Sequence, residues 1–308
     1  MRGKRADTHD LLHQGYNAIN TMYAQGKGTS KHADKHSGRG FDGKIYSQET
    51  RKDYARKWEY FCEAMKASGY TVNGHRPRTM EEAAGFMPQY LEDLKTRPGK
   101  KPGTTMSAWT IRSYFSAAAK VLGISATGYQ LPERRREDIT RSRAPAARDA
   151  HFSEARNADL VSFASCTGLR NKKELQQIRG TDLIERPDGS YSIAVTGKGG
   201  KYRESAVYGS PEEVRAVVDR MKAAGSAIVW PHVHTAADIH AYRAEYASRM
   251  YNAIARDPAT LPPGERYCCR GEMAGQWFDR AALMEVSKEL GHARCNVVVS
   301  HYLWRRRS

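Results

Sequence analysis

The second half of the chain holds five short motifs whose side chains could together act on a phosphodiester. They are the turn TGLR ending at Arg170, the glycine-rich run GKGGK at 197–201, the HxxR pair His240 and Arg243, LGH ending at His292, and Tyr302 close to the C-terminus. Each motif alone also has an ordinary structural explanation, such as helix punctuation or a solvated hairpin tip. GKGGK lacks the GxxxxGK[ST] spacing that a P-loop requires. Their order along the chain is what points to one shared site.

The residue types fit the transfer of a phosphodiester without a metal ion. Such a reaction needs a nucleophile, cations around the pentacoordinate phosphorane and an acid for the leaving oxygen. Tyr302 suits the nucleophile, because an aryl phosphodiester stores the energy of the broken bond. Arg170 and Arg243 can donate in bidentate fashion to the non-bridging oxygens, which lysine does less well.

The remaining candidates handle protons. His292 can donate a further hydrogen bond to the phosphate. His240 can accept the tyrosine proton or donate to the phosphate, since its charge is adjustable near neutral pH. Lys198, on a predicted hairpin, can protonate the departing 5′ hydroxyl. No metal-binding carboxylate cluster accompanies these residues in the sequence, so we expect neither a metal nor another cofactor.

The series Arg, hairpin Lys, HxxR, LGH and terminal Tyr resembles the tyrosine recombinases, the integrases of phages and other mobile elements. DIHAYRAEYASRMY (238–251) is similar to the HxLRHxxAxxL helix of that family, and KELGHARCNVVVSHYL (288–303) to its LGHxxxxxTxxY box. The resemblance is specific over about 150–308. It extends more loosely to 47–130, where the family has a helical domain that clamps the far side of the duplex.

The resemblance implies a mainly α fold with a small antiparallel sheet, in which a helical core-binding domain precedes a mixed α/β catalytic domain of the DNA breaking–rejoining type. It implies site-specific recombination by four protomers on two duplexes, through 3′-phosphotyrosyl intermediates and a Holliday junction. The expected role is integration or excision of a mobile element. The expected partners are double-stranded DNA, other copies of this chain as a homotetramer, and accessory DNA-bending factors. The implied catalytic residues are Arg170, Lys198, His240, Arg243, His292 and Tyr302.

Two departures from the family pattern and the choice of the catalytic lysine leave alternatives open. His292 and Tyr302 are ten positions apart instead of about nine, so the tyrosine lies further round its helix or the chain bulges. His240 and His292 are 52 positions apart, roughly double the usual separation, with the excess near 256–282. A competing alignment places Tyr267 to Arg270 at the HxxR position, but the apolar helix that follows Arg243 favours His240. Lys201 is the alternative to Lys198 as the acid.

Two other functions are compatible with these residues. A topoisomerase or telomere resolvase would use the same chemistry without a partner duplex. A DNA-binding protein with a degenerate site would have lost this chemistry. The presence of every catalytic residue type in the sequence argues against that alternative.

The elements that must position these side chains differ between the two halves. Residues 1–46 are rich in Gly, Lys, His and Ser and predict a mobile basic arm with room for one short helix. Apolar spacings predict a helical domain over 47–130, in which Pro88 should bend or restart a helix. Residues 131–150 carry six arginines without apolar periodicity and predict a basic linker.

The catalytic domain is expected over 151–308. Helices are predicted after Ser153, from about Asn171, from Pro211, over 238–255 and over 280–290. Strands are predicted at 191–195 and 202–207, joined at GKGGK.

Composition fits this organisation. The 308 residues suit two domains, and 50 Lys and Arg against 34 Asp and Glu give a net charge of +16, typical of proteins with a polyanionic partner.

Without an apolar run near the ~18 residues of a membrane helix, and with a polar start, we expect neither a membrane span nor a secretory signal. Five cysteines, an odd number, fit a reducing cytoplasm, where we expect association with the nucleoid. The histidines at 232–240 and the pair Cys268 and Cys269 lack the spacing of a zinc site.

Overall fold

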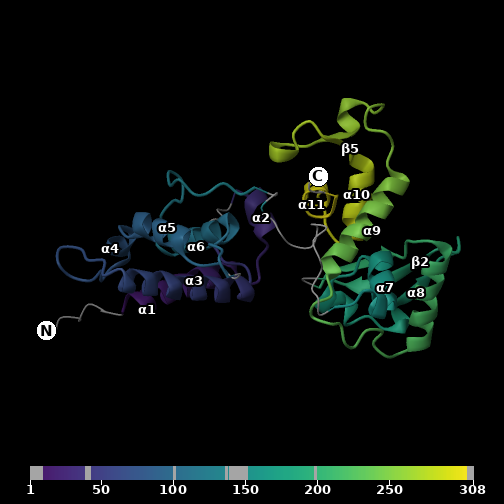
Figure 1. Ribbon diagram of the computed structural model, residues 1–308, viewed down its shortest axis with the longest axis horizontal. Coiled ribbons are helices and arrows are strands. Elements are labelled where there is room, and N and C mark those ends of the chain that lie inside the picture. The colour runs from purple at the N-terminus through teal and green to yellow at the C-terminus, as the bar shows by residue number, and fades with distance from the viewer. Residues whose placement is uncertain are drawn as a thin grey trace. The chain divides into compact units, whose positions relative to one another are not determined.

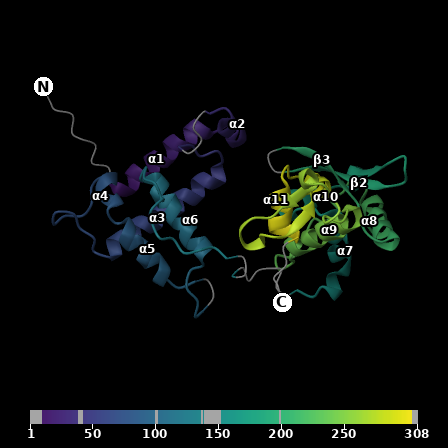
Figure 2. The ribbon, with the colours of Figure 1, turned by 90° about the horizontal axis from the view of Figure 1, so that it is seen from above.

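The computed structural model describes residues 10–38, 43–99, 102–135, 138, 152–197 and 200–303. The chain divides into two compact units, Met1–Arg134 and Arg135–Ser308. Both are mainly helical, and the second adds two small antiparallel sheets (Figures 1 and 2). The predicted fold class, mainly α with a small antiparallel sheet, is confirmed. Across the described ranges no helix is both long and apolar enough to cross a membrane.

The N-terminal unit is a set of helices around an aromatic core. They are α1 (Leu11–Gly26), α2 (Lys31–His36), α3 (Gln48–Ala67), α4 (Met80–Ala84), α5 (Met87–Thr96) and α6 (Ala108–Val121). In α3, Trp58, Phe61 and Met65 are buried as their spacing of three and four residues predicts. Pro88 lies in the first turn of α5, where a missing N–H breaks no helical bond, so the chain restarts a helix there.

Helix α1 occupies the part of 1–46 where the sequence left room for one short helix. It is 16 residues long, and its buried Leu11 and Ile19 join the core of this unit. A Cβ at Gly15 would lie 1.9 Å from Trp58 Nε1, so the glycine lets α1 approach α3. The indole then donates to the Leu12 carbonyl at 3.2 Å. The composition of 1–46, rich in Gly, Lys, His and Ser, did not predict that this helix would pack into the core.

The C-terminal unit begins with α7 and a three-stranded sheet. Its elements up to the insertion are α7 (Ala158–Thr167), β1 (Leu183–Glu185), β2 (Tyr191–Thr196), β3 (Tyr202–Ala206), α8 (Pro211–Ala224) and α9 (Ile239–Ile254). The strand order is β1-β2-β3, all antiparallel. The sequence predicted β2 and β3 but not β1. The helix expected from Asn171 is a single π-helical turn, η3 (Asn171–Leu175). The predicted linker over 131–150 lies largely outside the described residues.

The extra segment at 256–282 is a closed loop that leaves α9 and returns to α10 (Arg280–Glu289). It contains the hairpin of β4 (Arg266–Cys268) and β5 (Trp277–Asp279). Arg256 Nε donates to Asp279 Oδ2 at 2.8 Å across its base, and the other Asp279 oxygen accepts from Ala281 N at the start of α10. Both ends of the insertion therefore meet at Asp279. This arrangement is compatible with α9 and α10 contributing residues to one site.

Helix α9 runs between α7 and α8 on one side and α10 and α11 (Cys295–Val298) on the other (Figure 1), and it contributes residues to two apolar clusters. Tyr242 packs with α7, α8 and the sheet, whereas Tyr246 packs with α10 and α11. Arg243, between these two tyrosines in the sequence, is placed where the clusters meet.

Candidate active site

Arg243 lies at the centre of the site. Asp238 caps α9 by accepting from Ala241 N at 3.0 Å. One turn into the helix, Arg243 is 2% exposed. Its Nε donates to the Tyr302 hydroxyl at 3.0 Å, and its two terminal nitrogens donate to the carbonyls of Gly168 and Leu290. Burial lowers the pKa of this guanidinium, although the value of a free arginine is so high that the group stays charged.

Arg170 follows the left-handed end of α7. Gly168 has φ +58°, and a Cβ there would lie 2.5 Å from the Tyr246 ring, so only glycine fits this turn. Arg170 Nη2 donates to the Leu290 carbonyl at 3.0 Å and lies 3.5 Å from His292 Nε2. The two arginines thus share one carbonyl acceptor, which sets their guanidinium groups side by side.

A buried carboxylate, Glu174, holds both arginines. The π-helical turn η3 closes with bonds from Leu175 N to Arg170 O and from Gln176 N to Asn171 O, each five residues apart. This wide turn returns Glu174 to Arg170, whose Nη1 and backbone N donate to it at 2.6 and 2.8 Å. Burial alone would raise the pKa of Glu174, but the hydrogen bonds and charges of Arg203 and Arg170 hold it at about 2.

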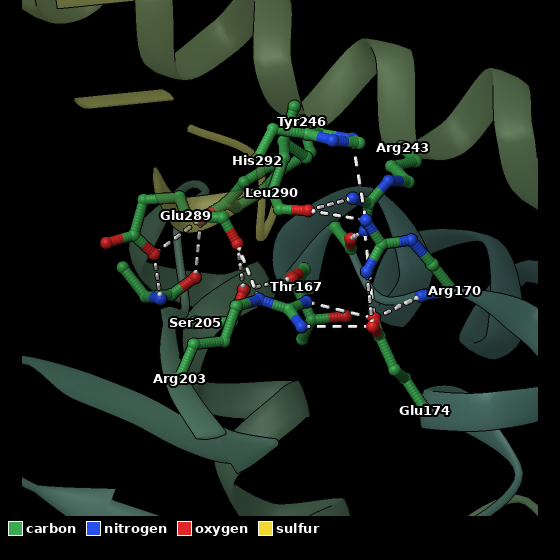
Figure 3. A network of polar contacts seen from close by, with 12 residues as sticks. Thr167, Arg170, Glu174, Arg203, Ser205, Arg243, Tyr246, Glu289, Leu290 and His292 are labelled. Carbon is green, nitrogen blue, oxygen red and sulfur yellow. Dashed lines mark hydrogen bonds and ion pairs between the residues drawn. The ribbon is translucent and has the colours of Figure 1, made fainter. Parts of the chain in front are cut away.

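A third arginine, Arg203 on β3, completes the network shown in Figure 3. Its Nη1 and Nη2 donate to the two oxygens of Glu174 at 3.0 and 2.9 Å, and its Nε donates to the Glu289 carbonyl at 2.9 Å. No role was assigned to Glu174 or Arg203 from the sequence. The available signals were an acidic residue one turn after Arg170 and an arginine at the last position of GKGGKYR.

His292 follows a tight turn at the end of α10. Gly291 has φ +69°, and His292 N donates to the Ser287 carbonyl at 2.7 Å. The ring nitrogen Nε2 lies 3.2 Å from the Tyr302 hydroxyl. Burial, together with the charges of Arg243 and Arg170, lowers the pKa of His292 to about 4, so the ring is neutral at neutral pH.

Tyr302 sits on a second π-helical turn, η7 (Val299–Leu303), which continues α11. A π turn holds one residue more than an α turn. The ten-residue spacing from His292 is therefore taken up by a bulge, one of the two geometries left open by the sequence. Tyr302 is buried with its hydroxyl between Arg243 and His292, while the neighbouring His301 is exposed.

The structure brings together most of the residues singled out from the sequence. Arg170, Arg243, His292 and Tyr302 are linked by the contacts above, and the His240 ring lies 5.3 Å from the Tyr302 ring. Lys198 lies outside the described residues. Lys201 is described and exposed. The alternative HxxR position falls on the insertion, where Tyr267 belongs to β4 and Arg270 is exposed.

In the part of the chain that the structure describes, no group of three or more His, Cys, Asp or Glu side chains is placed to hold an ion. Glu174 and Asp279, two buried acids, are each engaged by arginines. What the arrangement offers is a set of permanent cations and a neutral histidine around a phenol.

Comparisons with known proteins give distant structural likenesses only. No family model matches the chain, and no curated protein sequence is similar to it. It is similar to a solved structure described as XerH site-specific recombinase bound to palindromic difH substrate, post-cleavage complex, with 16% identity and a TM-score of 0.46 over 97% of this chain and 91% of that one. The pre-cleavage complex of XerH with difH gives 14% identity and a TM-score of 0.45 over 96% and 92% of the two chains.

Proposed function

We propose that this protein is a tyrosine site-specific recombinase that cuts and rejoins double-stranded DNA without a metal ion. The observation that carries the proposal is the position of the Tyr302 hydroxyl, 3.0 Å from Arg243 Nε and 3.2 Å from His292 Nε2. A phenol held between a buried arginine and a neutral histidine is equipped to attack a phosphorus atom.

In the proposed reaction the Tyr302 oxygen forms a bond to the scissile phosphorus and the bond from phosphorus to the 5′ oxygen breaks. The phenol proton passes to a histidine, for which His292 and His240 are the candidates. Arg170 and Arg243 donate to the non-bridging oxygens as their charge grows. Lys198, assigned from its place in GKGGK, gives a proton to the 5′ oxygen. Attack by a 5′ hydroxyl on the phosphotyrosine reverses these steps and rejoins a strand.

The N-terminal unit carries a groove that supports contact with DNA. It has a volume of about 740 Å³, and its lining includes Arg112, Arg134 and Trp109, together with Lys57 in an ion pair with Asp53. Trp109 is 42% exposed, with the Arg134 guanidinium 4.7 Å from its ring centre. Cations with an accessible aromatic surface are what a phosphate backbone and its bases attract.

The remaining parts of the proposal concern assembly and role. We propose a homotetramer on two specific DNA sites, aided by accessory DNA-bending factors. In this role the enzyme integrates or excises a mobile element in the cytoplasm, at the nucleoid.

The test is covalent capture from a library of nicked duplexes with randomised centres. The wild type should form an adduct that survives denaturation, with or without EDTA, and sequencing its DNA gives the site. Tyr302→Phe should form none, whereas the matched control Tyr267→Phe should behave as the wild type. An adduct formed by Tyr302→Phe would contradict the proposal. So would a wild-type adduct that EDTA abolishes and Mg²⁺ restores.

A plasmid carrying two copies of the recovered site then separates recombination from simple strand breakage. Recombinant products support the recombinase. Relaxation without recombinants supports the topoisomerase. Binding without an adduct supports the degenerate DNA-binding protein.

A further inference from the structure

Arg203 holds the candidate site together from outside it. Its side chain is 11% exposed, and each of its three nitrogens donates within the protein, two to Glu174 and one to the Glu289 carbonyl. Its nitrogens are therefore engaged with Glu174 and the end of α10, whereas Arg243 also donates to the Tyr302 hydroxyl and Arg170 lies 3.5 Å from His292 Nε2.

The charges explain what Arg203 does for Glu174. Three guanidinium groups surround one carboxylate: Arg203 and Arg170 by hydrogen bonds, and Arg243 with its Nη1 3.8 Å from Glu174 Oε2. Glu174 is 1% exposed, and burial disfavours its charged form. Arg203 supplies the largest opposing contribution. Without it, the carboxylate is held by Arg170 alone at hydrogen-bond distance.

Arg203 also joins two elements that are distant in sequence. Its Nε reaches Glu289, the last residue of α10, and the next carbonyl, that of Leu290, accepts from Arg170 and Arg243. Ser205, two residues further along β3, donates to the Thr167 carbonyl at 2.9 Å, just before the turn that leads to Arg170. Strand β3 therefore contacts both the end of α10 and the end of α7, the two segments that position Arg170 and Arg243 (Figure 3).

We propose that Arg203 is a positioning residue: it fixes the Glu174 carboxylate and the end of α10, and through them the guanidinium groups of Arg170 and Arg243. This inference rests on the proposed function, because the positioned groups are the ones assigned there to the phosphate.

The test compares Arg203→Met with Arg186→Met. Arg186 directly follows β1 of the same sheet and donates to Glu204 at 2.7 Å and to the Ser192 hydroxyl at 3.0 Å, but its side chain is 44% exposed, so its loss should have only a small effect on cleavage. On the DNA site recovered by covalent capture, Arg203→Met should slow single-turnover cleavage by about 10–100-fold, as loss of the residues that orient metal ligands does. DNA affinity in a gel-shift assay should stay at the wild-type value. An equal fall in affinity and rate would overturn the inference, because Arg203 would then act by binding DNA.

Two further readouts separate positioning from a general structural defect. In Arg203→Met the burial of Glu174 is less opposed, so the carboxylate takes up a proton at a higher pH than in the wild type. Cleavage by the variant should therefore fall with decreasing pH in a range where the wild type is unaffected. In the double variant with Glu174→Gln the two defects should overlap in part, so that its loss of rate is smaller than the product of the two single losses; the remainder reflects the contact of Arg203 with the end of α10. An unshifted pH profile, or defects that multiply, would overturn the inference.

Arg203→Lys covers the case in which Arg203→Met does not fold. Lysine keeps a charge beside Glu174 but cannot donate to both carboxylate oxygens and to Glu289 at once. It should cleave slowly with a wild-type pH profile, and wild-type speed would overturn the proposal. The wild type is the reference throughout. Failure of the wild type to form an adduct refutes the proposed function itself, whereas a wild-type adduct with unimpaired Arg203 variants refutes this inference alone.

Discussion

Replacing Gly168 by alanine should damage the C-terminal unit by an amount that the structure divides into two parts. The first is backbone strain, because a residue with a side chain at φ +58° costs about 1–2 kcal/mol. The second is a clash, since the new Cβ would lie 2.5 Å from the ring of Tyr246, which is fully buried. Overpacking of this kind costs about 1–3 kcal/mol. The expected loss in free energy of unfolding is therefore about 2–5 kcal/mol.

The variant Gly189→Ala measures the backbone strain without the clash. Gly189 has φ +80° in the turn between β1 and β2, and a Cβ there would meet nothing within 4 Å. Its replacement should cost about 1–2 kcal/mol, the strain alone. Hydrogen exchange of peptides from α7 and α9, measured against denaturant, gives the free energy of opening in both variants. Equal losses in the two would refute the reasoning, because they would mean that Tyr246 does not confine the turn before Arg170.

Three more predictions concern the site. Because His292 is neutral when folded down to about pH 4 whereas a free histidine takes up a proton near 6.5, stability should fall as pH drops between these values, and His292→Gln should flatten that fall in denaturant titrations. Arg170→Ala should slow cleavage by ~10²–10³-fold at unchanged DNA affinity, since its hydrogen bonds strengthen as phosphorane charge develops; parallel losses in rate and affinity would show that it only holds the backbone. A substrate with sulfur at the bridging 5′ position should restore cleavage to Lys198→Ala but not to Arg170→Ala, because a thiolate leaves without a proton. If the sulfur substrate instead restores cleavage to Lys201→Ala, then Lys201 and not Lys198 is the general acid.

The helices that the sequence predicted well are those whose burial is periodic along one segment. The stripe through Trp58, Phe61 and Met65 is an example, because three- and four-residue spacings place side chains on one face. The sequence left room for a short helix at α1 but did not predict its packing, because its contact with α3 depends on the absence of a side chain at Gly15. Strand β1 was missed because three residues are too few for an alternation to stand out.

The residues of the site divide in the same way, into those found by local sequence patterns and those that depend on contacts between distant segments. Short motifs pointed to Arg170, Arg243, His292 and Tyr302, since each lies in a local pattern of residue types. Glu174 and Arg203 were not assigned, because what gives them a role is pairing across 29 positions of sequence. Local patterns carry no information about such pairs. Their function becomes readable only when β3 and η3 are placed side by side.

The two π-helical turns have a consequence for residue spacing in this site. Each turn, η3 with Glu174 and η7 with Tyr302, contains one residue more than an α turn. Deleting a single residue from η7 would convert it to an α turn while the tyrosine kept its place. The number of residues between His292 and Tyr302 could thus change by one while the tyrosine stays beside Arg243 and His292. Genome searches that demand a fixed interval would pass over chains like this one, and searches that allow one residue of slack at each turn would retrieve them.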